Sequence, residues 1–272
     1  MSGVVLAVVE HQAVVRQTLA AAQNLAGLMG SARINVLAIR VPPDPANMPT
    51  EEILTRHQAT DFQAHEQARV AALHAVFEVW AATTRAPGIT IEWIEIEGLA
   101  DSLVAEWGKR SDFLVLHRPG AHDNAADRLK LQAALFDTDR PVLLVPPGPV
   151  ATFGERVAIA WRDDKRTVRA VLAALRLLSK AQQVHVLTGA REGAPAPDLP
   201  EILAEHGIAA TLHILPVGGR VFGEKLLAKA HALGADMLVT GAYTHNPWRE
   251  VILGGVTRHM LAHADLPVLM RH

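Results

Sequence analysis

Short apolar runs alternate along the whole chain with longer segments in which apolar residues recur every three or four positions. The runs are rich in valine, isoleucine and leucine and are apolar at nearly every position, which is typical of strands buried on both faces of a parallel sheet. The pattern predicts strands at 4–9, 34–41, 89–97, 112–117, 141–145, 156–161, 183–188, 210–215, 236–240 and 267–270. It predicts helices at 12–30, 50–84, 99–109, 125–136, 166–179, 198–207, 221–233 and 255–264.

The second part of the chain repeats the pattern of the first. An aspartate, Asp112 or Asp236, introduces one strand of each part, and a proline followed by valine, at Pro141 or Pro267, introduces the last strand. The Pro-Pro-Gly-Pro stretch at 146–149 interrupts regular structure between the two copies. The repeat therefore predicts a tandem duplication with one folding unit in each copy. The expected domains are residues 1–146 and residues 153–272.

Strands that alternate with helices predict an α/β fold with a doubly wound parallel sheet in each domain. The crossover connections of such a sheet are right-handed, and helices cover both of its faces. Ligands bind beyond the carboxyl ends of the strands, where the strand order reverses. Candidate functional residues are therefore sought in the loops that directly follow strands.

The composition narrows the protein class. Half of the 272 residues are apolar and a fifth are charged, which is typical of a folded globular chain. The formal net charge of −2 lacks the basic footprint of a nucleic-acid-binding protein. No uncharged apolar run approaches the roughly 18 residues of a membrane span, and the first strand has no basic flank of a signal peptide. We expect a cytoplasmic protein without nucleic-acid or membrane partners.

The segment after the strand at 236–240 is the strongest candidate for a ligand-binding site. Gly241 ends the strand, a polar loop follows, and Gly254-Gly255 precedes or opens the last helix. Glycines allow close approach of the backbone to a phosphate, and the free N–H groups at a helix N-terminus attract negative charge. The segment therefore predicts an anion-binding loop.

The spacing of this loop resembles that of the universal stress proteins. Members that bind ATP carry Gly-x-x-Gly, nine residues and then Gly-Ser/Thr, followed by a last strand that begins with Pro-Val. Here Gly241 and Gly254 stand at two of the glycine positions, Thr244 replaces the other glycine, and Gly255 replaces the serine or threonine. The resemblance covers essentially the whole chain, in two tandem copies.

The resemblance implies a fold, a ligand and a mode of association. The fold is an adenine nucleotide alpha hydrolase-like pair of five-stranded sheets, each with strand order 3-2-1-4-5. The ligand is ATP or AMP, bound by the second domain, and the first strand of that domain ends near an aspartate that contacts the nucleoside. Members pair through their last strands, so we expect 142–145 to lie against 268–270, and a homodimer of the chain is a further expectation. The expected nucleotide-binding residues are Asp163, Gly241, Tyr243, Thr244, Gly254, Gly255, Val256 and Thr257.

Two functions stay open at this point. The first is a cytosolic stress-response protein with a regulatory role linked to an adenine nucleotide. The second is a nucleotide-free member of the same family that binds proteins or another small ligand, which Thr244 and Gly255 favour. The first domain has diverged further, because Lys130 stands near the expected place of the glycine pair.

No catalytic or metal-binding set is expected. The chain has no cysteine and no Gly-x-Ser-x-Gly elbow, so we expect no enzyme of an ordinary kind, while slow ATP hydrolysis stays open. The glycine-rich segment before Lys225 lacks the Lys-Ser/Thr pair of a P-loop. His57, Asp61 and His65 share one helix face but span about 12 Å, too far for one metal ion.

Overall fold

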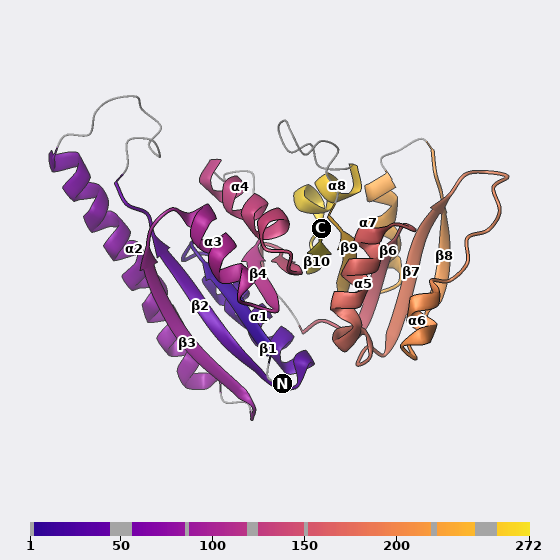
Figure 1. Ribbon diagram of the computed structural model, residues 1–272, viewed down its shortest axis with the longest axis horizontal. Coiled ribbons are helices and arrows are strands. Elements are labelled where there is room, and N and C mark those ends of the chain that lie inside the picture. Colours follow the sequence, from indigo (N-terminus) through magenta and orange to yellow (C-terminus); the bar gives the residue numbers. More distant parts are fainter. Residues whose placement is uncertain are drawn as a thin grey trace. The chain divides into compact units, whose positions relative to one another are not determined.

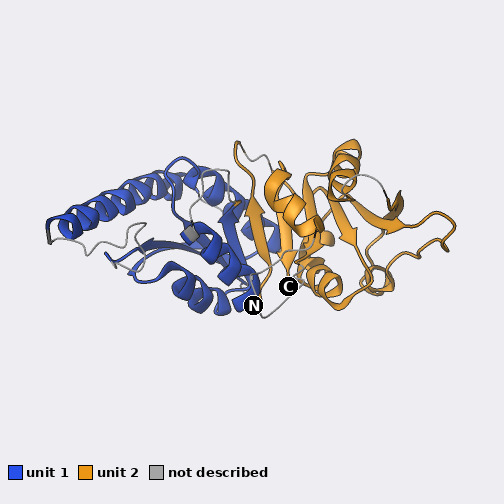
Figure 2. Cartoon of the chain, turned by 90° about the horizontal axis from the view of Figure 1, so that it is seen from above, with its two compact units in different colours: residues 1–117, 121–138 blue, residues 118–120, 139–272 orange. Residues whose placement is uncertain are grey.

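The structure is a computed structural model that describes residues 3–43, 56–84, 87–118, 125–149, 152–218, 222–242 and 255–272. The chain forms two compact units (Figure 2). The first unit comprises residues 1–117 and 121–138, and the second comprises residues 118–120 and 139–272.

The first unit contains a parallel sheet with helices on its faces (Figure 1). Its strands lie in the order β3-β2-β1-β4, all parallel. The strands are β1 (Gly3–Val9), β2 (Ala32–Arg40), β3 (Ile89–Glu97) and β4 (Phe113–His117). The helices are α1 (Val15–Met29), α2 (Arg56–Thr83), α3 (Ala100–Lys109) and α4 (Ala125–Gln132). The helix predicted at 125–136 differs in detail, because α4 passes into a π-helical turn, η2 (Ala133–Asp137).

The core of the first unit lies along the central strands. β1 and β2 are buried at nearly every position, as their mostly apolar sequences predict. α1 buries residues spaced three and four apart, among them Leu19, Ala22 and Ala26, against this sheet. By contrast β3 alternates between more and less exposed positions, which fits its place at the end of the strand order.

The second unit contains six strands in the order β5-β10-β9-β6-β7-β8. They are β5 (Val142–Val145), β6 (Arg156–Trp161), β7 (Gln183–Ala190), β8 (Thr211–Pro216), β9 (Met237–Gly241) and β10 (Val268–Arg271). The helices are α5 (Lys165–Leu178), α6 (Glu201–Glu205), α7 (Phe222–Ala232) and α8 (Gly255–His263). The strands of the second repeat are parallel and follow the order 3-2-1-4-5, so the expected doubly wound α/β fold is confirmed.

The expected pairing of the last strands is also confirmed. β5 and β10 run antiparallel, with Leu143 opposite Leu269 and Val142 opposite Met270. All of these residues are buried. The pairing covers two apolar strand edges that would otherwise be free to pair with other chains. No helix among the described residues combines the length and the apolar character that crossing a bilayer requires.

Candidate functional sites

A cavity of about 370 Å³ opens at the carboxyl ends of β6 and β7 in the second unit. β6 contributes Trp161 at its last position, and β7 contributes Thr188 and Gly189. This edge of a doubly wound sheet is the place where ligands bind. The described residues that line the cavity are Trp161, Arg162, Asp163, Thr188, Gly189, Pro197, Val217 and Phe222.

Strand pairing places this cavity beside the end of β9. Ala160 of β6 lies opposite Thr240 of β9, so the residues that follow them, Trp161 and Gly241, end neighbouring parallel strands at the same level. The sheet order changes direction between these two strands, because β7 and β8 lie on one side of β6 and β9 and β10 on the other. The structure therefore brings Asp163 and Gly241 to one edge of the second sheet, at its switch point.

Two consecutive aspartates after β6 have different roles. The carboxylate of Asp164 accepts hydrogen bonds from the N–H groups of Arg166 and Thr167, at 3.0 and 3.1 Å, and so caps the N-terminus of α5. Its other oxygen lies 3.2 Å from Nε of Arg162. Asp163 is exposed and lines the cavity. Of the two aspartates, Asp163 is the one that lines the cavity.

The first turn of α8 contains three of the expected nucleotide-binding residues. Gly255 is exposed, and a Cβ atom added there would meet nothing within 4 Å among the described residues beyond its own helix. Val256 is half-buried, whereas Thr257 is fully buried. The remaining expected residues, Tyr243, Thr244 and Gly254, lie outside the described residues.

The glycine-rich segment before Lys225 serves packing. Nζ of Lys225 donates to the carbonyl oxygens of Pro216 and Gly218, at 2.9 and 2.7 Å, and so ties α7 to the end of β8. A Cβ atom on Gly223 would lie 2.5 Å from Cβ of His259, so glycine allows α7 to approach α8 closely. These contacts explain the segment without a bound phosphate.

A second cavity, of about 200 Å³, lies at the carboxyl ends of β1 and β2 in the first unit. Its walls are partly apolar, but charged side chains from three elements gather in it. They are Glu10 and His11 after β1, Glu66 and Arg69 on α2, and Asp127 and Lys130 on α4.

Lys130 holds the centre of this charged group. Its ammonium contacts the carboxylate of Glu10 and lies 2.8 Å from Oδ1 of Asp127. The side chains of Lys130 and Asp127 are only 10% and 8% exposed, so these ion pairs are largely withdrawn from solvent. Such a pair is costly to break, because a partner left alone would be a buried, uncompensated charge.

Arg69 fixes the backbone around the same cavity. Its guanidinium pairs with Glu66 through two nitrogen atoms and donates to the carbonyl oxygens of Glu10 and Ile39, at 2.9 and 2.6 Å. Burial alone would raise the pKa of Glu66, but hydrogen bonds from Arg69 and from the N–H of Val41 outweigh burial, and its pKa is lowered. The carboxyl ends of β1 and β2 are thereby joined to α2.

The sequence profile of the universal stress protein family matches residues 117–272. The chain belongs to this family. The match covers more than half of the chain and includes the whole second repeat, with the cavity beside Gly241. The family assignment from the repeat and from the loop spacing is therefore confirmed.

Solved structures extend the likeness to the whole chain. A universal stress protein from Archaeoglobus fulgidus DSM 4304 superposes with a TM-score of 0.72 at 17% identity, over 100% of this chain and 98% of that one. A putative universal stress protein from Pseudomonas aeruginosa UCBPP-PA14 has a TM-score of 0.61 at 16% identity, over 99% and 93% of the two chains. At these identities the likeness shows the fold. No curated protein is significantly similar to the chain.

The charged group of the first unit was not expected from the sequence of this universal stress protein. Glu10 and His11 lie near the start of the first repeat and Asp127 and Lys130 near its end, so only the fold brings them together. One signal was present: Lys130 stands near the place where the resemblance puts the glycine pair.

His11 is expected to be the last of four histidines to lose its proton as the pH rises. A hydrogen bond to Asp127 raises the pKa of His11, although burial acts against it, while Glu10 adds to the rise. Burial lowers the pKa of His185, His213 and His259. In an NMR titration of the imidazole signals, His11 should titrate above the ordinary value of about 6.5 and the other three below it.

The raised pKa of His11 also determines how its contribution to the stability of the folded chain changes with pH. The pKa of His11 is higher in the folded chain, so its contribution to stability is complete below about pH 6.5 and is lost as the pH rises through the raised value. Asp127→Asn should move the titration of His11 down and leave that of His213 unchanged. A His11 that titrates with His213 in the unsubstituted protein would contradict the contact with Asp127.

Proposed function

We propose that this universal stress protein is a cytoplasmic, non-enzymatic regulator in the stress response that binds an adenine nucleotide, ATP or AMP, in its second unit. The observation that carries the proposal is the cavity at the carboxyl ends of β6 and β7, which the exposed residue Asp163 lines; β6 is paired with β9, which ends at Gly241. The cavity volume of about 370 Å³ lies within the range of small-ligand sites.

The lining divides the cavity into an apolar and a polar part. Trp161, Val217 and Phe222 offer apolar and aromatic surface on which a purine ring can pack. The carboxylate of Asp163 can accept hydrogen bonds from ribose hydroxyl groups, as the aspartate of the family does. The phosphates would then extend past Gly241 towards the backbone N–H groups that begin α8, where negative charge is stabilised.

One observation favours a nucleotide-free binding function as the second candidate. Gly255 offers no hydroxyl group to a phosphate, and the aromatic and aliphatic side chains in the cavity suit an uncharged ligand equally well. In that case the cavity takes another small molecule or a side chain of a protein partner.

Calorimetric titration with ATP and with AMP, together with native mass spectrometry of the freshly purified protein, separates the two functions. We expect one nucleotide per chain, and we expect Asp163→Ala to weaken binding about tenfold, the loss of hydrogen bonds to a charged group. Glu205→Ala is the matched control, because Glu205 is exposed on α6 and does not line the cavity. A protein that carries no nucleotide and binds neither compound would remove the proposal.

Restoring the hydroxyl group of the family loop should strengthen nucleotide binding. Gly255→Ser meets no neighbouring atom within 4 Å, and the residue has no positive φ that would strain a side chain. One hydrogen bond to phosphate contributes about 1 kcal/mol, so we expect a roughly five-fold lower Kd for ATP in calorimetry. Gly255→Ala tests the hydroxyl separately and should leave the Kd unchanged. An equal effect of both substitutions would assign the change to the helix and not to the phosphate.

A further inference from the structure

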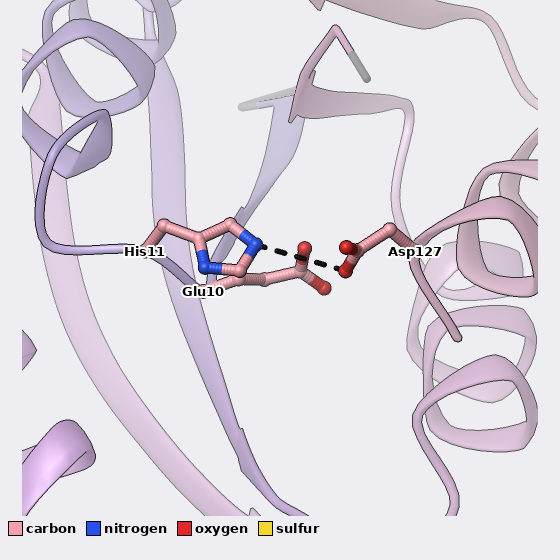
Figure 3. A group of neighbouring side chains, drawn as sticks. All are labelled: Glu10, His11 and Asp127. Atoms are coloured by element: carbon pink, nitrogen blue, oxygen red, sulfur yellow. Dashed lines mark ion pairs between the residues drawn. The ribbon is translucent and has the colours of Figure 1, made fainter. Parts of the chain in front are cut away.

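Three metal-ligating side chains converge in the first unit. The ligand atoms of Glu10, His11 and Asp127 all lie within 4.8 Å of one another, and Nε2 of His11 is 3.7 Å from Oδ1 of Asp127. Figure 3 shows the imidazole and the two carboxylates pointing toward one another from opposite sides of the same space. Among the described residues this is the one group of at least three histidine or acidic side chains with such spacing.

The ammonium of Lys130 shows that this space holds a cation. It contacts Glu10 and Asp127 in a cavity of about 200 Å³, and its side chain is 90% withdrawn from solvent. The four-carbon stem of a lysine is flexible, so the ammonium can leave the carboxylates without movement of the backbone of α4. His11, which offers a nitrogen ligand, lies 3.7 Å from the same oxygen of Asp127 that Lys130 contacts.

We propose that Glu10, His11 and Asp127 form a binding site for a divalent transition-metal cation, which enters by displacing the ammonium of Lys130. One imidazole nitrogen and two carboxylate oxygens suit Zn²⁺, with a water molecule as fourth ligand. Ligand distances of about 2.0–2.2 Å require the three side chains to close in by up to about 1 Å, within the reach of side-chain rotation.

The charge of the site suits a divalent cation. The carboxylates of Glu10 and Asp127 carry two negative charges, which the single ammonium of Lys130 offsets in part and a divalent cation would offset fully. The other charged groups that line the cavity are Glu66 and Arg69 on α2, which pair with each other at 2.8 Å, while α3 contributes only Ala100.

Zn²⁺ titration of the full chain by calorimetry, with Co²⁺ absorption as the spectroscopic readout of nitrogen and oxygen ligands, tests the site. We expect one Zn²⁺ per chain at this site. His11→Gln keeps the ion pairs of Lys130, so it should fold, and it should weaken Zn²⁺ binding at least tenfold. Lys130→Met removes the competing ammonium and should tighten binding about tenfold, and Asp127→Asn should abolish it.

A control separates this site from surface histidines. His259 and His263 lie one turn apart on α8, with ring centroids 4.5 Å apart and ring planes tilted by 43°, and such a pair can also hold a metal ion. His263→Gln removes that pair and should leave the high-affinity Zn²⁺ site unchanged. Binding that is lost in His263→Gln but kept in His11→Gln would overturn the proposal. Zn²⁺ binding that appears only in Lys130→Met would also overturn it, because Lys130 would then be the permanent occupant.

Discussion

Lys130→Met is expected to lower the stability of the first unit by about 3 kcal/mol, measured in metal-free buffer with a chelator. The substitution keeps the length and the apolar stem of the side chain but removes the ammonium that joins Glu10 to Asp127. Removal of one partner from a buried ion pair typically costs about 3–5 kcal/mol, because the remaining carboxylates are left without compensation. The half-exposed imidazole of His11 offsets part of this cost, which sets the expected loss at the lower end.

Thermal or urea unfolding measures this loss, and a surface ion pair provides the matched control. Arg110 pairs with Glu106 at 2.7 Å across one turn of α3, with both side chains more than half exposed. Arg110→Met should therefore cost less than about 1 kcal/mol. At about 2–4 °C per kcal/mol, the Tm of Lys130→Met should fall by roughly 6–12 °C. Equal losses for the two substitutions would show that the Lys130 pair is no stronger than a surface pair.

The fold could be predicted because the apolar pattern that determines it is local and occurs in both repeats. Unbroken apolar runs such as 36–39 and 157–160 become buried parallel strands, because helices cover both faces of the sheet. Asp164 before the helical pattern of the second repeat becomes the cap of α5. The pairing of β5 with β10 also followed from the sequence, through the resemblance to proteins that associate by their last strands.

The sequence predicted part of the cavity in the second unit but not the charged cavity in the first unit. Asp163 and Gly241 could be placed at one edge because Gly241 ends a strand and Asp163 closely follows one, and parallel strands end together. The ion pair of Lys130 with Glu10 could not be placed, since it depends on where α4 packs over the sheet and not on spacing along the chain. Periodicity assigns a charged residue to the solvent face of a helix. It does not reveal that the carboxylate of Glu10, which follows the distant strand β1, lies within reach of Lys130.

The two repeats place an aspartate before their fourth strand, and this residue joins two strands in each unit. The N–H of Asp112 donates to the carbonyl of Val4 at 2.8 Å, while its carboxylate accepts from the N–H of the same residue at 2.7 Å. In the second unit the N–H of Asp236 donates to the carbonyl of Arg156 at 2.9 Å. Both repeats therefore keep an aspartate that joins the fourth strand to the first strand by hydrogen bonds.

The aspartate of the second unit makes more hydrogen bonds than that of the first unit. Besides Arg156, the carboxylate of Asp236 accepts N–H groups from Gly154 and Glu155, so three consecutive amides converge on it at 2.8–3.1 Å. Gly154 and Glu155 directly precede β6, and Arg156 is its first residue. The carboxylate therefore fixes the start of the strand that leads to Trp161 and the cavity of the second unit.

Asp236→Ala should consequently destabilise the second unit by about 3 kcal/mol, whereas Asp112→Ala should cost the first unit about 1 kcal/mol. A hydrogen bond to a charged group contributes about 1.5–3 kcal/mol when buried, and partial exposure of these amides reduces each contribution to about 1 kcal/mol. Urea unfolding followed by the fluorescence of Trp161 or Trp93, as the remaining tryptophan of otherwise Trp→Phe variants, reports the two units separately. Equal losses of stability in the two variants would mean that one amide hydrogen bond accounts for the effect of each aspartate. The two further amides that Asp236 binds would then be hydrogen-bonded equally well by water.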